Sequence, residues 1–122
     1  MNGDIEGAEQ SLHWFKNLFG DDFYIEIQRH KTDKFNADKT TFERQQEVNK
    51  ILIELARKTD TKIIATNDVH FVEEEHGEAH DRLICLSTGK DFDDPDRMHY
   101  TKQEWLKTPQ EMGVAFCDLP EA

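Results

Sequence analysis

The sequence predicts an α/β fold built around a strand, a helix and a second strand, and three observations support this prediction. In residues 23–28 every second side chain is apolar, as in a strand with one buried face. Apolar residues recur at helical spacing over residues 48–55. The short segment 62–66, with the apolar run Ile63-Ile64-Ala65, is typical of a strand covered on both faces. This order favours a right-handed βαβ crossover, in which the two strands pair in parallel.

Helices are expected before and between these strands. Apolar residues recur at helical spacing over residues 12–19, and Gly20 follows as a C-terminal stop. Thr40 and Glu43 match a capping box with Thr40 as the cap. The central helix is therefore expected to begin at Thr40 and to end near Lys58.

A third helix is expected over residues 73–86. Its apolar residues Ala79, Leu83 and Leu86 are predicted to face inward. The stretch 87–99 holds a glycine, a proline and four aspartates, so it is predicted to be an irregular connection.

The last helix is expected to begin at a second capping box. Thr108 and Glu111 have the required spacing, and Pro109 stands at the first helical position. This helix is predicted to stop at Leu119-Pro120. Helices thus follow the βαβ unit toward the C-terminus.

Composition limits the classes of function. The chain has 122 residues, enough for one domain or part of one, and carries a net charge of -11. A nucleic-acid binder usually presents a basic face, so the chain alone is expected to bind no nucleic acid. No apolar run approaches the roughly 20 residues of a membrane span, and residues 1–6 do not resemble a signal peptide. A cytoplasmic chain without a membrane partner is expected, with Cys85 and Cys117 reduced.

Candidate chemistry gathers in residues 67–81. Asp68 and His70 are two apart at the end of a predicted strand, where their side chains would leave the same face. A carboxylate and an imidazole so placed can share a divalent cation such as Zn, Mn or Fe. His76 and His80 are four apart and would share a helix face.

Simpler interpretations compete with a metal site. With 13 Asp and 6 His in 122 residues, about 0.6 Asp-x-His pairs are expected by chance. Two ligands are also fewer than the three or four protein groups of an ordinary metal site. His76 and His80 fit a solvated acidic helix face. Glu26, Gln28 and His30 fit a polar sheet face.

Several segments, in order, carry a resemblance to a known family. They read Leu-Phe-Gly-Asp-Asp-Phe-Tyr-Ile-Glu-Ile-Gln-Arg-His at 18–30, Ala-Thr-Asn-Asp-Val-His-Phe at 65–71, Glu-Ala-His-Asp through Thr-Gly-Lys at 78–90, and Asp-Pro-Asp-Arg-Met at 94–98. The tail continues with Leu-Lys-Thr-Pro-Gln-Glu-Met at 106–112, then Phe116 and residues 119–122. Together they resemble the alpha subunit of bacterial DNA polymerase III, a C-family replicative polymerase, over nearly the whole chain.

This resemblance implies a place within the family's PHP (polymerase and histidinol phosphatase) domain. Residues 1–86 would form the C-terminal part of that domain, and residues 87–122 an irregular connection and helix leading toward the polymerase palm. The implied fold is a fragment of a distorted TIM-like barrel, consisting of the βαβ unit and C-terminal helices.

The resemblance also implies site residues. Asp68 and His70 match the last pair of the family's metal cluster, which takes Zn, Mn or Fe, while the other ligands lie upstream. Apart from the resemblance, Glu26, His30 and His80 are further candidates to surround that pair. The Mg of the polymerase site and its catalytic aspartates would lie outside this chain, so the isolated chain is expected to bind no cofactor and to lack catalysis.

Two functional classes remain open on this basis, with a weaker third. The first is a replicative DNA-directed DNA polymerase, with primed DNA, dNTPs and other replisome subunits as partners of the parent and PHP 3′–5′ exonuclease activity as an option. The second is a free-standing PHP-type phosphoesterase, and the third is an acidic protein-interaction module. The isolated chain is also expected to form homodimers through exposed sheet edges.

Overall fold

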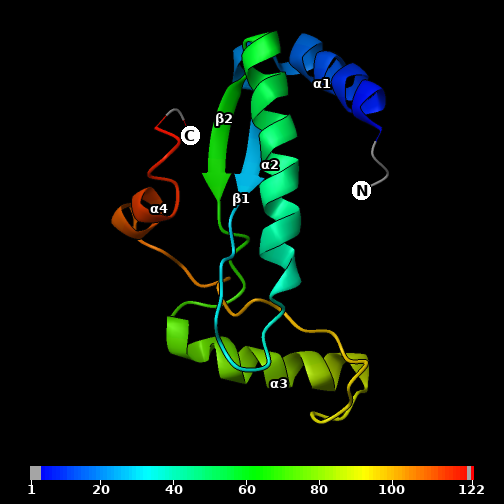
Figure 1. Ribbon diagram of the computed structural model, residues 1–122, viewed down its shortest axis with the longest axis vertical. Helices are drawn as coiled ribbons and strands as arrows, with labels where there is room; N and C mark the ends of the chain where they lie inside the picture. The colour runs from blue at the N-terminus through cyan, green and yellow to red at the C-terminus, as the bar shows by residue number, and fades with distance from the viewer. Residues whose placement is uncertain (1–3, 121) are drawn as a thin grey trace.

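A computed structural model of the chain describes residues 4–120 and residue 122, and shows two strands flanked by helices (Figure 1). The helices are α1 (Ile5–Phe19), α2 (Thr40–Thr59), α3 (Gly77–Thr88) and α4 (Pro109–Ala115). The strands are β1 (Tyr24–Gln28) and β2 (Lys62–Thr66). Two short 3-10 helices, η1 (Gly20–Asp22) and η2 (Glu74–His76), precede β1 and α3.

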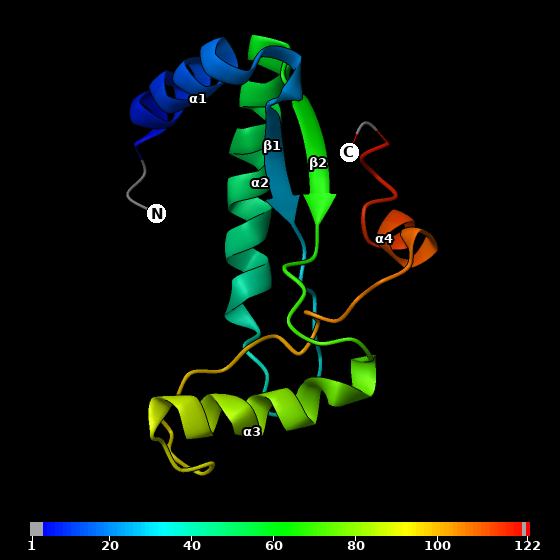
Figure 2. The same cartoon turned by 180° about the vertical axis from the view of Figure 1, so that it is seen from behind.

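The two strands pair in parallel, as predicted. The register runs from Tyr24 opposite Lys62 to Gln28 opposite Thr66, with α2 as the crossover. Seen from either side, α2 runs along the sheet while α3 lies across the carboxyl ends of the strands (Figures 1 and 2). The α/β class and the βαβ unit are confirmed. Because the described residues form one two-stranded sheet, the barrel stays a prediction.

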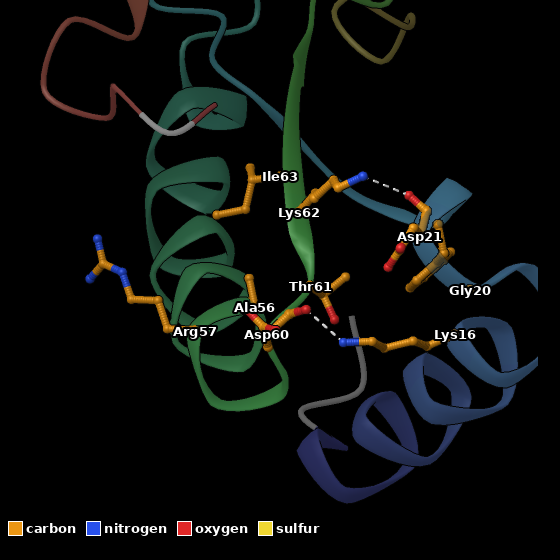
Figure 3. A pocket seen from close by; sticks show the side chains of 10 residues that line it. Lys16, Gly20, Asp21, Ala56, Arg57, Asp60, Thr61, Lys62 and Ile63 are labelled. Atoms are coloured by element: carbon orange, nitrogen blue, oxygen red, sulfur yellow. Dashed lines mark hydrogen bonds between the residues drawn. The ribbon is translucent and has the colours of Figure 1, made fainter.

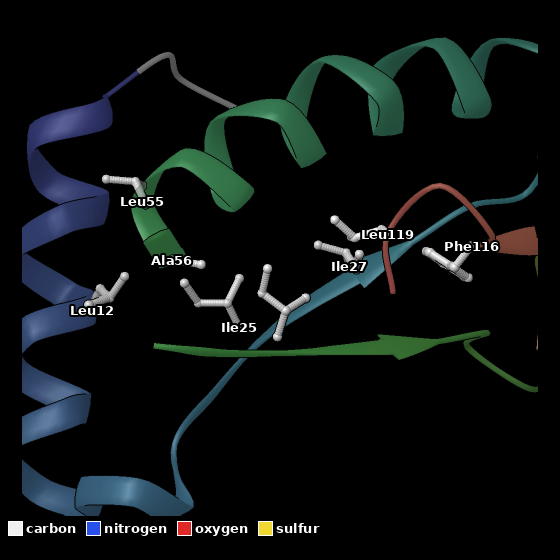
Figure 4. Close-up of a cluster of buried hydrophobic side chains, with 8 residues drawn as sticks. Leu12, Ile25, Ile27, Leu55, Ala56, Phe116 and Leu119 are labelled. Carbon is white, nitrogen blue, oxygen red and sulfur yellow. The ribbon is translucent and has the colours of Figure 1, made fainter. Parts of the chain in front are cut away.

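The hydrophobic core lies on one face of the sheet (Figure 4). Its buried members come from both strands, from α1 and α2, and from the turn after α4: Leu12, Ile25, Ile27, Leu55, Ala56, Ile63, Phe116 and Leu119. On the opposite face Tyr24 and Ile64 are exposed. The prediction that the second strand is covered on both faces is therefore wrong for this chain.

The ends of α1 and α2 follow local chemistry. Gly20 ends α1 with a φ of 58°, as predicted. The cap predicted for α2 is wrong, because Thr40 lies within the helix and Asp38 supplies the capping contacts. The Asp38 carboxylate accepts hydrogen bonds from the backbone N–H and the hydroxyl of Thr40, both at 2.8 Å, and from the Thr41 hydroxyl at 2.6 Å. Asp38, two residues before the helix, thus accepts the hydrogen bonds at its N-terminus.

The inward face of α3 differs from the prediction. Leu83 and Leu86 are exposed, at 60% and 80%, and Ala79 is exposed as well. The buried residues of this helix are instead Gly77, Asp81 and Cys85. The reason is a buried ion pair made by Asp81, described below, which turns this face toward the rest of the chain.

The remaining predictions for the C-terminal part are largely confirmed. Residues 89–107 contain no helix, and Thr108 and Glu111 form the predicted reciprocal cap with Pro109 at the first position. The helix is shorter than expected, however, because α4 ends at Ala115 and a turn follows it. Cys85 and Cys117 are both free thiols. Among the described residues, no helix is long and apolar enough to span a bilayer.

Candidate functional site

The Asp68–His70 pair lies in a turn after β2 rather than in the strand itself. β2 ends at Thr66, and Asp68 has a left-handed backbone with a φ of 45°. Strand alternation, which suggested that the two side chains share a face, therefore does not apply. The turn nonetheless brings them together, with His70 Nδ1 3.9 Å from Asp68 Oδ2.

A backbone contact sets the tautomer of His70. Its Nδ1 lies 2.6 Å from the carbonyl oxygen of Asp68. A carbonyl can only accept a hydrogen bond, so Nδ1 carries a proton, and in the neutral ring the lone pair is then on Nε2. A metal-ligating histidine is typically held in this way, with one ring nitrogen donating to a carbonyl or carboxylate. In the neutral ring, Nε2 is therefore the nitrogen of His70 that this contact leaves without a proton.

A distant segment, residues 101–106, clamps this turn. The backbone N–H of His70 donates to the Glu104 carbonyl at 2.7 Å. The buried Asn67 donates from its side-chain amide to the carbonyls of Gln103 and Trp105, at 2.8 and 2.7 Å. The position of His70 therefore depends on a segment more than thirty residues away in the sequence.

Aromatic rings enclose His70 on one side. Its ring centroid lies 5.5 Å from that of His80 and 4.9 Å from that of Tyr100. Burial lowers the pKa of His80, and the nearby His70 lowers it further, against the opposing charges of Glu104 and Asp81. His80 therefore lies beside His70, and the solvated-face interpretation is wrong for it.

The other histidines have different roles. His76 is exposed, and its Nδ1 accepts a hydrogen bond from the Glu73 backbone at 3.2 Å within the cap of η2. His30 is buried, with Nδ1 2.9 Å from the Gln45 amide nitrogen and Nε2 3.2 Å from the Asn67 carbonyl. The amide donates to Nδ1 and Nε2 donates to the carbonyl, so neither nitrogen of His30 is left for a metal.

Glu26 lies on the open face of the sheet. It is hydrogen-bonded to the Thr66 hydroxyl and, at 3.2 Å, to the Gln28 amide. Glu26 lies in β1, whereas His80 lies in α3 beside His70. Among the described residues, no contact of Glu26 with the Asp68–His70 pair is present. The simpler interpretation, a polar sheet face, accounts for Glu26.

A buried ionic network behind the pair was missed by the sequence analysis. Asp81 forms a bidentate pair with Arg97, with O–N distances of 2.6 and 2.9 Å. Lys102, which is 2% exposed, lies 3.6 Å from Asp81 and 2.6 Å from Glu78. Burial alone would raise the pKa of Asp81, but the hydrogen bond from Arg97 and the charge of Lys102 lower it overall. The one sign of this network in the sequence was Arg97, a single arginine that directly follows the acidic stretch 91–96.

A pocket opens at the amino ends of the strands (Figure 3). It encloses about 400 Å³, and Lys16 and Lys62 line it. Lys16 donates to the carbonyls of Thr59 and Asp60 at 2.5 and 2.6 Å, and Lys62 to the Asp21 carbonyl at 2.9 Å. Lys16 therefore binds the carbonyls at the end of α2, and Lys62 binds a carbonyl of the turn before β1. Both ammonium groups are already hydrogen-bonded within the chain.

Asp68 and His70 supply two metal ligands at most. Within residues 4–120 and residue 122, no three His, Cys, Asp or Glu side chains converge as a metal site requires. A cation held here through His70 Nε2 and Asp68 would need further ligands from outside this set.

Comparison with known proteins identifies the family. No family model matches the chain. The chain is 37% identical over 118 residues to DNA polymerase III subunit alpha of Campylobacter jejuni, covering 96% of this chain and 9% of that protein. It is 36% identical over 123 residues to the subunit of Pseudomonas aeruginosa, covering 100% of this chain and 10% of that protein. For the Thermus aquaticus subunit the identity is 38% over 119 residues, with coverage of 97% and 9%.

The chain spans about a tenth of the length of these curated relatives. The matches run through residues 87–122 as well as through the βαβ unit, because they cover nearly all of the chain. Over the segment that it represents, this chain belongs to the family of DNA polymerase III alpha subunits.

Proposed function

We propose that the chain contributes the later part of the PHP domain to a replicative DNA polymerase III alpha subunit, and that Asp68 and His70 are two ligands of that domain's metal site. The main support is the geometry of His70. Its Nδ1 donates to the Asp68 carbonyl at 2.6 Å, and the Asp68 carboxylate lies 3.9 Å from the ring. A hydrogen bond to a backbone carbonyl orients the His70 ring, as is usual for histidines that bind a metal.

The metal, Zn, Mn or Fe, would act when bound by polarising a phosphate oxygen and activating a water. The chain's own residues orient this site. Residues 101–106 fix the His70 main chain, and His80 and Tyr100 cover one side of its ring. Such a site would serve either removal of mispaired 3′ nucleotides or support of the polymerase structure.

The parent's partners follow from the family. We propose primed DNA, dNTPs and other replisome subunits as those partners, the cytoplasm as the location, and a Mg-dependent polymerase site elsewhere in the parent. The net charge of -11 supports the expectation that this chain alone does not bind DNA. We expect no catalysis by it alone, because the family's catalytic aspartates would lie outside it. A free-standing phosphoesterase is the weaker candidate, because the polymerase relatives match the chain through its C-terminal part.

The metal content of the full-length polymerase tests this function. His70→Ala should lower bound Zn, Mn or Fe, measured by mass spectrometry of the purified protein, because it removes one ligand. His76→Ala, an exposed histidine six residues away, is the matched control and should retain the metal. Equal metal in both variants would contradict the role of His70. In the isolated chain, micromolar Zn or Mn should barely raise the melting temperature, since a two-ligand site binds weakly.

A further inference from the structure

Lys107 is hydrogen-bonded to the segment that clamps the turn of Asp68 and His70. Its Nζ donates to the carbonyl oxygen of Gln103 at 2.5 Å. The same oxygen accepts a hydrogen bond from the side-chain amide of Asn67 at 2.8 Å, and Asn67 directly precedes Asp68. A change at the amine of Lys107 is therefore one shared acceptor away from the residue next to Asp68.

An indole ring and a carbonyl, rather than a carboxylate, contact this amine. The Lys107 side chain is half-buried, and its Nζ lies 4.5 Å from the centroid of the Trp105 ring. Among the described residues, no carboxylate forms an ion pair with Lys107. Burial lowers the pKa of Lys107 to about 8. Of the charged groups that face it, the three acidic ones raise the pKa and the basic one lowers it: Glu104, Glu74, Glu111 and Lys34.

The amine of Lys107 can act as a nucleophile near neutral pH. With a pKa of about 8, roughly a quarter of the Lys107 side chains are neutral at pH 7.5, against about 0.1% for a lysine with the ordinary pKa of about 10.4. A neutral amine still has N–H groups to donate to the Gln103 carbonyl, so this hydrogen bond does not occupy its lone pair. The exposed half of the side chain gives a small reagent access to that lone pair.

We propose that Lys107 is acylated by small acyl phosphates, and that its acylation loosens the turn that carries Asp68 and His70. In this reaction the amine nitrogen attacks the acyl carbon, and the bond from that carbon to the phosphate oxygen breaks. Phosphate leaves with the electron pair, and the proton released by the nitrogen passes to it through water. The product is a neutral amide, which no longer lies over the Trp105 ring as a cation and adds an acyl group beside Gln103. The acylation itself is independent of the proposed metal site, whereas its consequence for a ligand turn rests on that proposed function.

Incubation of the chain with acetyl phosphate at pH 7.5, followed by peptide mass spectrometry, tests the reactivity. Acetylation of Lys107 should be at least tenfold faster than acetylation of Lys50, an exposed lysine of α2 that serves as the internal control. The rate at Lys107 should also level off above about pH 8, because the amine is then largely neutral. A rate at Lys107 that is within twofold of the rate at Lys50, or below it, would overturn the proposal.

Hydrogen exchange of the His70 amide tests the effect on the turn, because this N–H donates to the Glu104 carbonyl. Complete acetylation of Lys107 should raise the exchange rate of the His70 amide at least threefold. Lys107→Arg keeps a cation but does not react, so acetyl phosphate should leave the exchange rate of this variant unchanged. Lys107→Gln should raise the rate without any reagent, whereas Lys50→Gln should not.

Unchanged exchange of the His70 amide in a chain acetylated at Lys107 would overturn the loosening of the turn. The same increase in Lys107→Arg would overturn it as well, because the effect would then come from another lysine. None of these measurements requires a metal, so their failure is distinct from a failure of the proposed metal site.

Discussion

Replacing Asp81 with asparagine tests the buried ionic network directly. The Asp81 and Arg97 side chains are 3% and 1% exposed, and the substitution leaves the guanidinium with a neutral partner. Removing one partner of a buried pair costs about 3–5 kcal/mol, because the other charge stays buried and uncompensated. For a chain of this size each kcal/mol lowers the melting temperature by roughly 3–5 °C, so a fall of about 10–20 °C is expected.

Urea denaturation followed by circular dichroism measures this loss. Asp94→Asn is the matched control, since Asp94 pairs with Lys90 at 3.0 Å on the surface and its loss should leave stability unchanged within error. A loss below about 1 kcal/mol for Asp81→Asn would refute the assignment, because such values are typical of surface pairs.

The pH dependence of this difference provides a second check. The folded-state pKa of Asp81 is lowered, so its contribution is fully present above the unfolded pKa of about 3.9. It is lost as the pH falls through the folded-state pKa. The stability difference between wild type and Asp81→Asn should therefore begin to shrink below about pH 4 and disappear once the pH is below the folded-state pKa of Asp81. A difference that persists unchanged to lower pH would show that lost packing, and not lost charge, destabilises the variant.

Further predictions concern the clamp, a cap, a lysine and DNA. Asn67→Ala should cost about 1–3 kcal/mol in urea denaturation, because two partly buried carbonyls lose their donor. Thr108→Ala should cost about 0.5–2 kcal/mol and shorten α4 as seen by hydrogen exchange. Burial lowers the pKa of Lys107 to about 8, so mass spectrometry should find it acylated before exposed lysines at pH 8. Fluorescence anisotropy should detect no micromolar binding of the chain to primed DNA; salt-sensitive binding would instead reveal a local basic strip.

Patterns within one segment predicted the fold well. Alternation in β1 and helical spacing in α2 specified the parallel pair, and the cap of α4 was read from Thr108 and Glu111. The cap of α2 was missed because an aspartate two residues earlier satisfies the same groups. The buried face of α3 could not be read from hydrophobicity, since it is set by a polar residue with a partner sixteen positions away.

The candidate site was predicted only in part. Asp68 and His70 were placed together, but for a reason that does not hold, because a left-handed turn and not a strand joins them. Burial of Lys102 and Glu104 was not predicted, since charged residues are rarely buried unless tertiary partners offset their desolvation. Dimerisation through the sheet edges stays a prediction.

The clamp on His70 couples the ligand turn to the C-terminal part of the chain. Glu104 holds the His70 main chain, while Lys102, two residues earlier, is anchored on α3 through Glu78. Beyond the clamp, Leu119 and Phe116 pack into the core beside Ile27. The segment between these two contacts therefore links the turn that holds His70 to the hydrophobic core. A displacement of the C-terminal part would move the Glu104 carbonyl, and with it the main chain of His70.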